Sequence, residues 1–269
     1  MPVEERTFAL PGPPLVAKVK VGGSGDPLVF FHGASGNAWT PLHDRLAAQF
    51  TVYAPWHPGW DSLDDLDHFD SLLDLVLYYV DIFDALGLRA PDCAGHSFGG
   101  MVAAEIAAIR PDRVRRLALI APWGLWRDEE PVADLWGLAP DRVAALLWHD
   151  PAGAAAAGHA PGREPEARLQ AYLANAAAAH FVWPIPDRRL DRRLHRVTAP
   201  TLLVWGRQDG VVPPSYAADF GARLPDSVTC LLDAAAHNVH LEQPDAVAAA
   251  IAGHLHAVPS GAPSPSGRP

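Results

Sequence analysis

Cysteine is scarce in this chain, with only Cys93 and Cys230 among 269 residues. Both lie in apolar, strand-like runs, which is typical of small core residues rather than of disulfide partners or a nucleophile. No cluster of cysteine and histidine has the spacing of metal ligands, and the glycine run at 33–36 lacks the lysine of a phosphate-binding loop. The sequence therefore predicts no metal and no cofactor.

Positive charge and long apolar runs are also lacking. The formal net charge is −10, which argues against nucleic acid or an anionic membrane surface as a partner. No run of 18 apolar residues occurs, since Asp81 and Asp84 interrupt the apolar stretch at 72–86. The charged start, Met-Pro-Val-Glu-Glu-Arg, is not that of a signal peptide. We expect a cytoplasmic protein that binds a small-molecule substrate; nothing in the sequence indicates its oligomeric state.

What the chain does have is apolar content, 49%, and a regular alternation of strand-like and helix-like segments. At this length it can form a single α/β domain with a large core. The alternation predicts a doubly wound, mostly parallel sheet. The expected strands are Leu28–Phe31, Val52–Ala54, Ala90–Ala94, Leu117–Ala121, Val197–Trp205 and Val228–Leu232, with helices at Ser71–Leu86 and Ser97–Ile109.

The alternation stops after Pro122. Residues 123–195 are helix-like and rich in alanine, proline and tryptophan, with five arginines and two interleaved aspartates at 187–196 that favour a solvated helix face. The last residues are too poor in apolar side chains to fold. We therefore divide the chain into a core formed by residues 1–121 and 197–256, an insertion at 122–196, and a disordered tail at 257–269.

The sequence Gly-His-Ser-Phe-Gly-Gly at 95–100 joins a predicted strand to a predicted helix. In this context G-x-S-x-G is the nucleophile elbow, a tight turn that exposes the serine at the top of the sheet. Glycines allow strand and helix to approach closely around a strained Ser97. The N–H of Phe98 would point toward the atom under attack.

A serine needs a base to take its proton, and the base needs an acid to hold its tautomer. Asp209 and His237 each follow a predicted strand, at the sheet edge where α/β proteins build their sites. Their competitors are His240 for the base, and Asp128 and Asp233 for the acid. We expect His32 and His96 to have packing roles.

The chain resembles the α/β-hydrolase fold superfamily from about residue 15 to 256. The resemblance rests on Phe-Phe-His-Gly-Ala-Ser-Gly at 30–36, the elbow, Trp-Gly-Arg-Gln-Asp-Gly-Val-Val-Pro at 205–213, and His-Asn-Val-His-Leu-Glu-Gln-Pro at 237–244. It implies Ser97 as nucleophile, Asp209 as acid and His237 as base. It also implies an oxyanion hole formed by the backbone N–H groups of Phe98 and of Ala34 or its neighbour Ser35, and a helical lid at 122–196.

The tryptophans of this predicted lid indicate an apolar substrate pocket, because pockets are lined mainly by aromatic and aliphatic groups. We expect substrate contacts from Trp123, Trp126, Trp148 and Trp183. The function expected is serine-dependent hydrolysis of a small to medium, partly apolar carboxylic ester or lactone through an acyl-enzyme.

Three alternatives stay open. One is a C–C bond hydrolase similar to the meta-cleavage-product hydrolases, although Phe98 and the short 33–36 loop depart from their pattern. Another is a cofactor-free perhydrolase, since relatives with that activity have similar elbows. A non-catalytic, ligand-binding hydrolase fold is the third, because fold does not fix function.

Overall fold

The computed structural model describes residues 2–11, 14–159, 164–183 and 187–257. Its centre is an eight-stranded sheet with the strand order β1-β2-β4-β3-β5-β6-β7-β8. The strands are β1 (Glu4–Ala9), β2 (Val16–Gly23), β3 (Asp26–Phe31), β4 (Phe50–Pro55), β5 (Asp92–His96), β6 (Leu117–Ile120), β7 (Thr201–Gly206) and β8 (Ser227–Leu232).

The sheet is antiparallel at one edge and parallel elsewhere. Strand β1 pairs with β2, and β2 with β4, in antiparallel register. From β4 through β3 to β8 every pairing is parallel, for example Leu28 opposite Val52 and Val29 opposite Cys93. The predicted doubly wound, mostly parallel sheet is therefore confirmed, and the edge hairpin of β1 and β2 adds to it.

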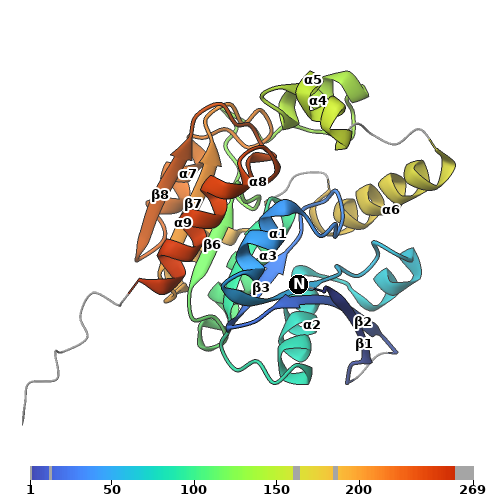
Figure 1. Ribbon diagram of the computed structural model, residues 1–269, viewed down its shortest axis with the longest axis vertical. Coiled ribbons are helices and arrows are strands. Elements are labelled where there is room, and N and C mark those ends of the chain that lie inside the picture. Colours follow the sequence, from blue (N-terminus) through green and yellow to red (C-terminus); the bar gives the residue numbers. More distant parts are fainter. Residues whose placement is uncertain (1, 12–13, 160–163, 184–186, 258–269) are drawn as a thin grey trace, which may run out of the picture.

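Helices cover both faces of the sheet (Figure 1). On one face lie α1 (Pro41–Ala47), α8 (Val239–Glu242) and α9 (Pro244–His256); on the other lie α2 (Leu72–Ala85), α3 (Phe98–Ile109) and α7 (Tyr216–Gly221). Strand β3 shows how one strand serves both layers. Leu28 and Phe30 pack into the core under α1 and α9, and Val29 and Phe31 pack into the core under α2 and α3.

Between β6 and β7 the chain leaves the sheet and forms further helices, with α4 and α5 at the top and α6 at the right in Figure 1. These are α4 (Pro140–Leu147), α5 (Pro151–Ala154), the π-helical turn η3 (Ala155–His159) and α6 (Pro165–Val182), followed by the 3₁₀ turns η4 (Leu190–Arg192) and η5 (Leu194–Arg196). Gly124 forms an isolated bridge with Asp187, so the segment leaves and returns at one place. That this insertion is a lid stays a prediction.

Two strands begin later than the sequence suggested. The expected strand Ala90–Ala94 is Asp92–His96, and the expected Val197–Trp205 begins at Thr201. In both cases the strand starts directly after a proline, Pro91 or Pro200. Proline has no N–H to donate to a neighbouring strand, so these two prolines precede the hydrogen-bonded part of the strand rather than lie within it.

The arginine-rich segment is only partly the solvated helix face that we expected: Arg189 and Arg192 are exposed, but the segment forms two short 3₁₀ turns and other arginines bind α3. Arg193 binds both carboxylate oxygens of Glu105 on α3, with Nε to Oε2 at 2.8 Å. Arg196 donates to the carbonyl of Ala108 on the same helix at 3.0 Å. These side chains therefore tie the end of the insertion to α3.

Other sequence expectations have mixed outcomes. Cys93 is buried and Cys230 half-buried, and both thiols are free. The predicted disordered tail lies, from residue 258 on, outside the described residues. Among the described helices, none combines the length and apolar character that a membrane crossing requires.

Candidate active site

Ser97 occupies the turn between β5 and α3 with a backbone conformation that side chains rarely adopt, φ 54° and ψ −116°. Two glycines make the turn possible. A Cβ at Gly95 would lie 2.4 Å from the carbonyl oxygen of Gly99, and one at Gly99 would lie 2.2 Å from that of Phe31. No side chain tolerates such contacts, so the motif's glycines are required by the close approach of strand and helix.

Backbone hydrogen bonds fix the peptide of Ser97 on both sides. Its N–H donates to Ile120 at the end of β6 at 2.9 Å. Its carbonyl oxygen accepts hydrogen bonds from two backbone N–H groups, that of Met101 at 3.0 Å and that of Trp123 at 3.1 Å. Trp123 lies at the start of the insertion. Surroundings that determine the backbone this fully can maintain a strained conformation.

Three side chains from three loops meet at this turn. The Oγ of Ser97 lies 2.9 Å from Nε2 of His237, and Nδ1 of His237 lies 2.9 Å from Oδ2 of Asp209. Asp209 follows β7 and His237 follows β8, at the carboxyl ends of parallel strands. All three residues are buried.

The contacts of Asp209 fix the tautomer of the imidazole. The N–H groups of Val211 and Val212 donate to Oδ1 at 2.8 and 2.9 Å, so the carboxylate is oriented by its own loop. A carboxylate only accepts, so His237 carries its proton on Nδ1. Its Nε2 is then free to accept the hydroxyl proton of Ser97.

The competing residues lie elsewhere. His240 packs against His96 at 4.0 Å between ring centroids, and burial lowers its pKa to about 3. Asp128 accepts from the indole N–H of Trp126 at 2.9 Å. Asp233 is exposed and pairs with Arg207 at 2.8 Å. The structure brings Ser97, His237 and Asp209 together, and none of these three rivals takes part in that contact.

The loop after β3 passes beside the elbow. Phe98 is the first residue of α3, so its N–H has no partner within the helix. Ala34 is half-buried and packs against the core, whereas Ser35 is exposed. The indole N–H of Trp60 donates to the carbonyl of Ala34 at 3.1 Å, which orients that peptide.

A buried histidine pair, which the sequence reasoning did not identify as a unit, supports this loop. Nδ1–H of His32 donates to the carbonyl of Gly33 at 2.7 Å. His57 donates its backbone N–H to Nε2 of His32 and its own Nε2–H to the carbonyl of His32, at 3.1 and 2.8 Å. The Tyr79 hydroxyl is hydrogen-bonded to Nδ1 of His57. Burial lowers the pKa of His57 to about 3, and that of His32 well below its usual value, so both rings are neutral.

His96 contacts two of the loops that form the site. Its Nε2–H donates to the carbonyl of His237 at 2.9 Å, and its Nδ1 lies so close to Gly33 that a Cβ there would be 2.7 Å away. Burial lowers the pKa of His96 well below its usual value. One neutral ring thus positions both the histidine loop and the loop after β3, which agrees with the packing role expected for it.

The helical insertion is attached directly to the two loops that carry Asp209 and His237. The N–H of Gly210 donates to Leu146 and that of Asn238 to Leu147, at 3.2 and 2.9 Å. Glu242 adds a third link, because its two carboxylate oxygens accept N–H groups from Ala236 and from His149, each at 2.7 Å. These hydrogen bonds connect the insertion to the loops of the site, in which Ser97 is only 3% exposed.

The four tryptophans expected to contact substrate have different surroundings in the described part of the chain. Trp123 is buried, and ring contacts run from Phe98 through Trp123 and Trp136 to Trp183, which is 49% exposed. Trp126 borders a surface hollow beside Arg127, and Trp148 stacks on His159 at 5.0 Å. Their role in substrate binding stays a prediction. Two tryptophans that the sequence reasoning missed, Trp56 and Trp60, line a cavity next to Ser35 instead.

Comparisons with known proteins agree on one family. A family model described as "Alpha/beta hydrolase family" matches residues 28–250. The chain is 31% identical, over 84% of its length, to the dihydrolipoyllysine-residue acetyltransferase component of an acetoin cleaving system from Pseudomonas putida, but it spans only 62% of that protein. It is 28% identical to pimeloyl-[acyl-carrier protein] methyl ester esterase from Photobacterium profundum, over 83% of this chain and 92% of that protein.

Solved structures show the same fold. A meta-cleavage product hydrolase from Pseudomonas fluorescens matches with a TM-score of 0.74 at 20% identity, over 93% of this chain and 97% of that chain.

Proposed function

Because the chain belongs to the alpha/beta hydrolase family and is a hydrolase, we propose that it cleaves a small to medium, partly apolar carboxylic ester or lactone with Ser97 as nucleophile. The observation that carries the proposal is the continuous contact from Ser97 Oγ through His237 to Asp209, with both separations at 2.9 Å. The relative from Photobacterium profundum, an esterase by name, supports an ester as the bond.

In the proposed first step, Nε2 of His237 takes the hydroxyl proton while Oγ of Ser97 attacks the ester carbonyl carbon. The carbonyl π pair moves to oxygen and forms a tetrahedral intermediate. Asp209, fixed by Val211 and Val212, stabilises the imidazolium through its Nδ1–H. When the C–O bond to the alcohol breaks, Nε2–H protonates the departing oxygen, and the acyl group remains on Ser97.

Water completes the cycle by the same route. His237 takes a proton from water, the hydroxide oxygen attacks the acyl carbon, and the Ser97–acyl bond breaks as the imidazolium returns the proton to Oγ. The net reaction is ester plus water giving acid plus alcohol; a lactone gives one hydroxy acid. His237 is the proton acceptor in both half-reactions, whereas the nucleophile is Ser97 Oγ in the first and water in the second.

We assign the backbone N–H groups of Phe98 and Ala34 to the developing oxyanion. Donors that are fixed before the reaction stabilise charge without reorganising, and one such donor contributes about 10²–10³ in rate in well-studied cases. The bonds from Trp60 to Ala34 and from His32 to Gly33 support this assignment, because they hold the loop rigid. No metal or cofactor takes part in the proposed reaction.

The test is covalent labelling with a fluorophosphonate, together with turnover of p-nitrophenyl esters of rising chain length and one dienone C–C substrate. We expect labelling and ester turnover by the native chain and neither by Ser97→Ala. His237→Ala should be as inactive as Ser97→Ala, because triad members act as a unit, whereas His240→Ala is the matched control and should retain turnover. Labelling that persists in Ser97→Ala, or turnover of the dienone alone, would refute the ester assignment.

A further inference from the structure

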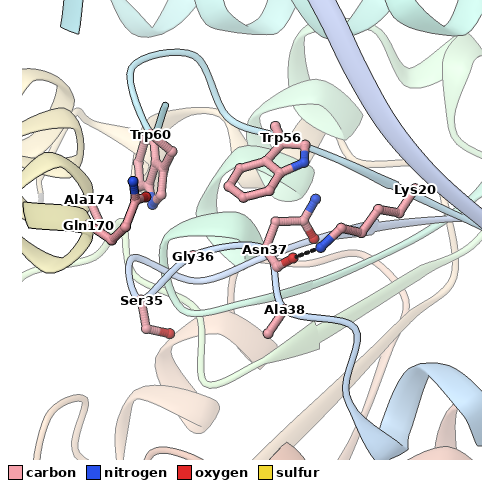
Figure 2. Close-up of a pocket in the computed structure, with 9 residues that line it drawn as sticks. All are labelled: Lys20, Ser35, Gly36, Asn37, Ala38, Trp56, Trp60, Gln170 and Ala174. Atoms are coloured by element: carbon pink, nitrogen blue, oxygen red, sulfur yellow. Dashed lines mark hydrogen bonds between the residues drawn. The ribbon is translucent and has the colours of Figure 1, made fainter. Parts of the chain in front are cut away.

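A cavity of about 300 Å³ opens beside the loop that carries Ala34 (Figure 2). Its walls come from four parts of the chain: β2, the loop after β3, the loop after β4, and α6. The lining residues are Lys20, Ser35, Gly36, Asn37, Ala38, Trp56, Trp60, Gln170 and Ala174. Ser35 is adjacent to Ala34, so the cavity begins one residue from the proposed oxyanion position.

One end of the cavity carries a single positive charge. Lys20 donates to the carbonyl oxygen of Asn37 at 2.5 Å, and its ammonium lies 5.1 Å from the centroid of a Trp56 ring. An ammonium has three donors, and within the described part of the chain this carbonyl is its one hydrogen-bond acceptor. None of the lining residues is acidic, although the protein has a net charge of −10.

The same end holds a buried acceptor without a partner. Asn37 is 3% exposed, and its Nδ2 donates to the carbonyl of Ala54 at 2.9 Å. Its Oδ1 has no hydrogen-bond partner among the described residues. In Figure 2 this oxygen and the Lys20 ammonium lie at the same end of the cavity. An unpartnered buried polar group is unfavourable, which points to a ligand or water that completes it.

Most of the rest of the wall is apolar, with Ser35 and Gln170 as its polar side chains. Trp60 is buried and Trp56 half-buried, and Ala174 of α6 is a third apolar residue of the wall, on the side of Trp60 (Figure 2). Such walls accommodate hydrocarbon, while the unpaired ammonium favours an anion. The expected occupant therefore has an apolar body and a negatively charged end.

We propose that this cavity binds the free carboxylate of a half-ester of a dicarboxylic acid, whose ester group reacts at Ser97. The carboxylate accepts from the two unused N–H groups of Lys20, and the hydrocarbon spacer lies along Trp60 and Trp56. This inference rests on the proposed esterase function and specifies the substrate class of the same site.

The kinetic test compares matched p-nitrophenyl esters. One series is the half-esters of succinate, glutarate, adipate and pimelate, and the other is the neutral esters of the same chain length that end in methyl. We expect kcat/KM to favour the half-ester by about tenfold at one chain length, since hydrogen bonds to charged groups are typically of this strength. Lys20→Met should bring the ratio of the two substrates close to one, and Lys20→Arg should retain most of it.

Lys18 provides the matched control, because it is the only other lysine and lies on the same strand, paired with Asp61. Lys18→Met removes the same charge but should leave the ratio at its native value. A ratio near one in the native chain, or an equal fall in both lysine variants, would overturn the proposal. So would preference for esters that end in a hydroxyl over those that end in a carboxylate.

A binding measurement separates this proposal from the proposed catalysis. Ser97→Ala cannot turn over, so binding of monomethyl adipate and of methyl hexanoate can be followed by tryptophan fluorescence. We expect monomethyl adipate to bind about tenfold more tightly than methyl hexanoate. This difference should be lost in the double variant that combines Ser97→Ala and Lys20→Met. Selective binding without turnover by the native chain would refute the esterase alone; turnover without selectivity would refute the carboxylate site alone.

Discussion

His57 and His32 fix each other's tautomers through two hydrogen bonds that run in the same direction. The backbone N–H of His57 donates to the His32 ring, and the His57 ring donates to the His32 carbonyl. Each ring nitrogen therefore has one defined role, and neither ring can accept a second proton without losing an acceptor position. The pair supports the loop of Gly33 and Ala34 only while both rings are neutral.

Acid should consequently destabilise the fold. Burial lowers the pKa of His57 to about 3, of His240 to about 3 and of His43 to about 4, and lowers those of His32 and His96 well below the usual value. The unfolded chain therefore binds these protons first, so the free energy of unfolding falls as pH drops below about 6.5. Each such histidine contributes about 1 kcal/mol per pH unit.

The measurement is urea unfolding at pH 7.5, 6.5 and 5.5 for the native chain and His57→Gln. Glutamine keeps a donor and an acceptor but does not titrate. The slope of the unfolding free energy against pH should therefore be smaller for His57→Gln, by about the contribution of one bound proton. The buried carboxyls of Asp92 and Glu105 have raised pKa values and act in the opposite direction. For that reason the comparison uses the difference between variants; identical slopes would contradict the prediction.

Backbone strain at Ser97 gives a second prediction. Glycine normally destabilises a protein by roughly 0.5–1 kcal/mol relative to alanine. At φ 54° and ψ −116° this order should reverse, because an unfavourable conformation costs a residue with a Cβ about 1–3 kcal/mol. Ser97→Gly should then be at least as stable as Ser97→Ala in denaturant unfolding. A clearly less stable glycine variant would mean that the turn is not strained.

The acid gives a third prediction. In Asp209→Asn the side-chain oxygen can still accept from Val211 and Val212, but the amide then donates toward Nδ1 of His237. The imidazole must place its proton on Nε2, where it cannot accept from Ser97. We expect kcat to fall roughly 10²–10⁴-fold with the fold retained by circular dichroism. Asp128→Asn is the control and should keep near-native rates; the reverse pattern would move the acid to the earlier strand.

Glu242 gives a fourth prediction, because it joins the histidine loop to the insertion. In Glu242→Gln one of the two N–H groups, of Ala236 or His149, faces an NH₂ instead of an oxygen. We expect a loss of about 1–2 kcal/mol in stability and faster proteolysis near α5, with a lower kcat because His237 is adjacent to Ala236. The exposed Glu166→Gln on α6 should change none of these. An unchanged rate of proteolysis would show that the hydrogen bonds of Glu242 do not restrain the insertion.

The ion pair of Arg193 and Glu105 gives the last prediction. Glu105 is 1% exposed, so Arg193→Met would leave a buried carboxylate without its partner. We expect a loss of roughly 2–4 kcal/mol, seen as a lower denaturation midpoint. Adding Glu105→Leu should recover part of it, because two apolar side chains tolerate burial together. The exposed Arg192→Met is the control, and an equal effect there would argue against a specific pair.

The parts of the site that the sequence predicted are those that a local motif encodes. The glycines around Ser97 and the strand ends before Asp209 and His237 are visible within a few residues. Lys20, Trp60 and His57 have no such signal, because their contacts join segments far apart in the chain. Glu242 lies in the motif at 237–244, but its contact with His149 could not be predicted from it.

The fold shows the same division between local and distant information. Buried parallel strands appear in the sequence as apolar runs, so their succession along the chain could be predicted. Strand β1, with five of its six residues exposed, has no such pattern, and β2 is its one partner among the strands of the described residues. The arginines at 187–196 were misinterpreted because the buried Glu105 that explains Arg193 lies 88 residues earlier.

The double hydrogen bond to the Ser97 carbonyl has a consequence for engineering chimeras. Because Trp123 and Met101 share this acceptor, the first residues of the insertion belong structurally to the nucleophile turn. Grafting a foreign insertion at Pro122 would replace Trp123, one of the two donors, and would therefore disturb the backbone of Ser97. The bridge between Gly124 and Asp187 marks the safer junction, where a transplanted segment can be exchanged while the recipient keeps its own reactive turn.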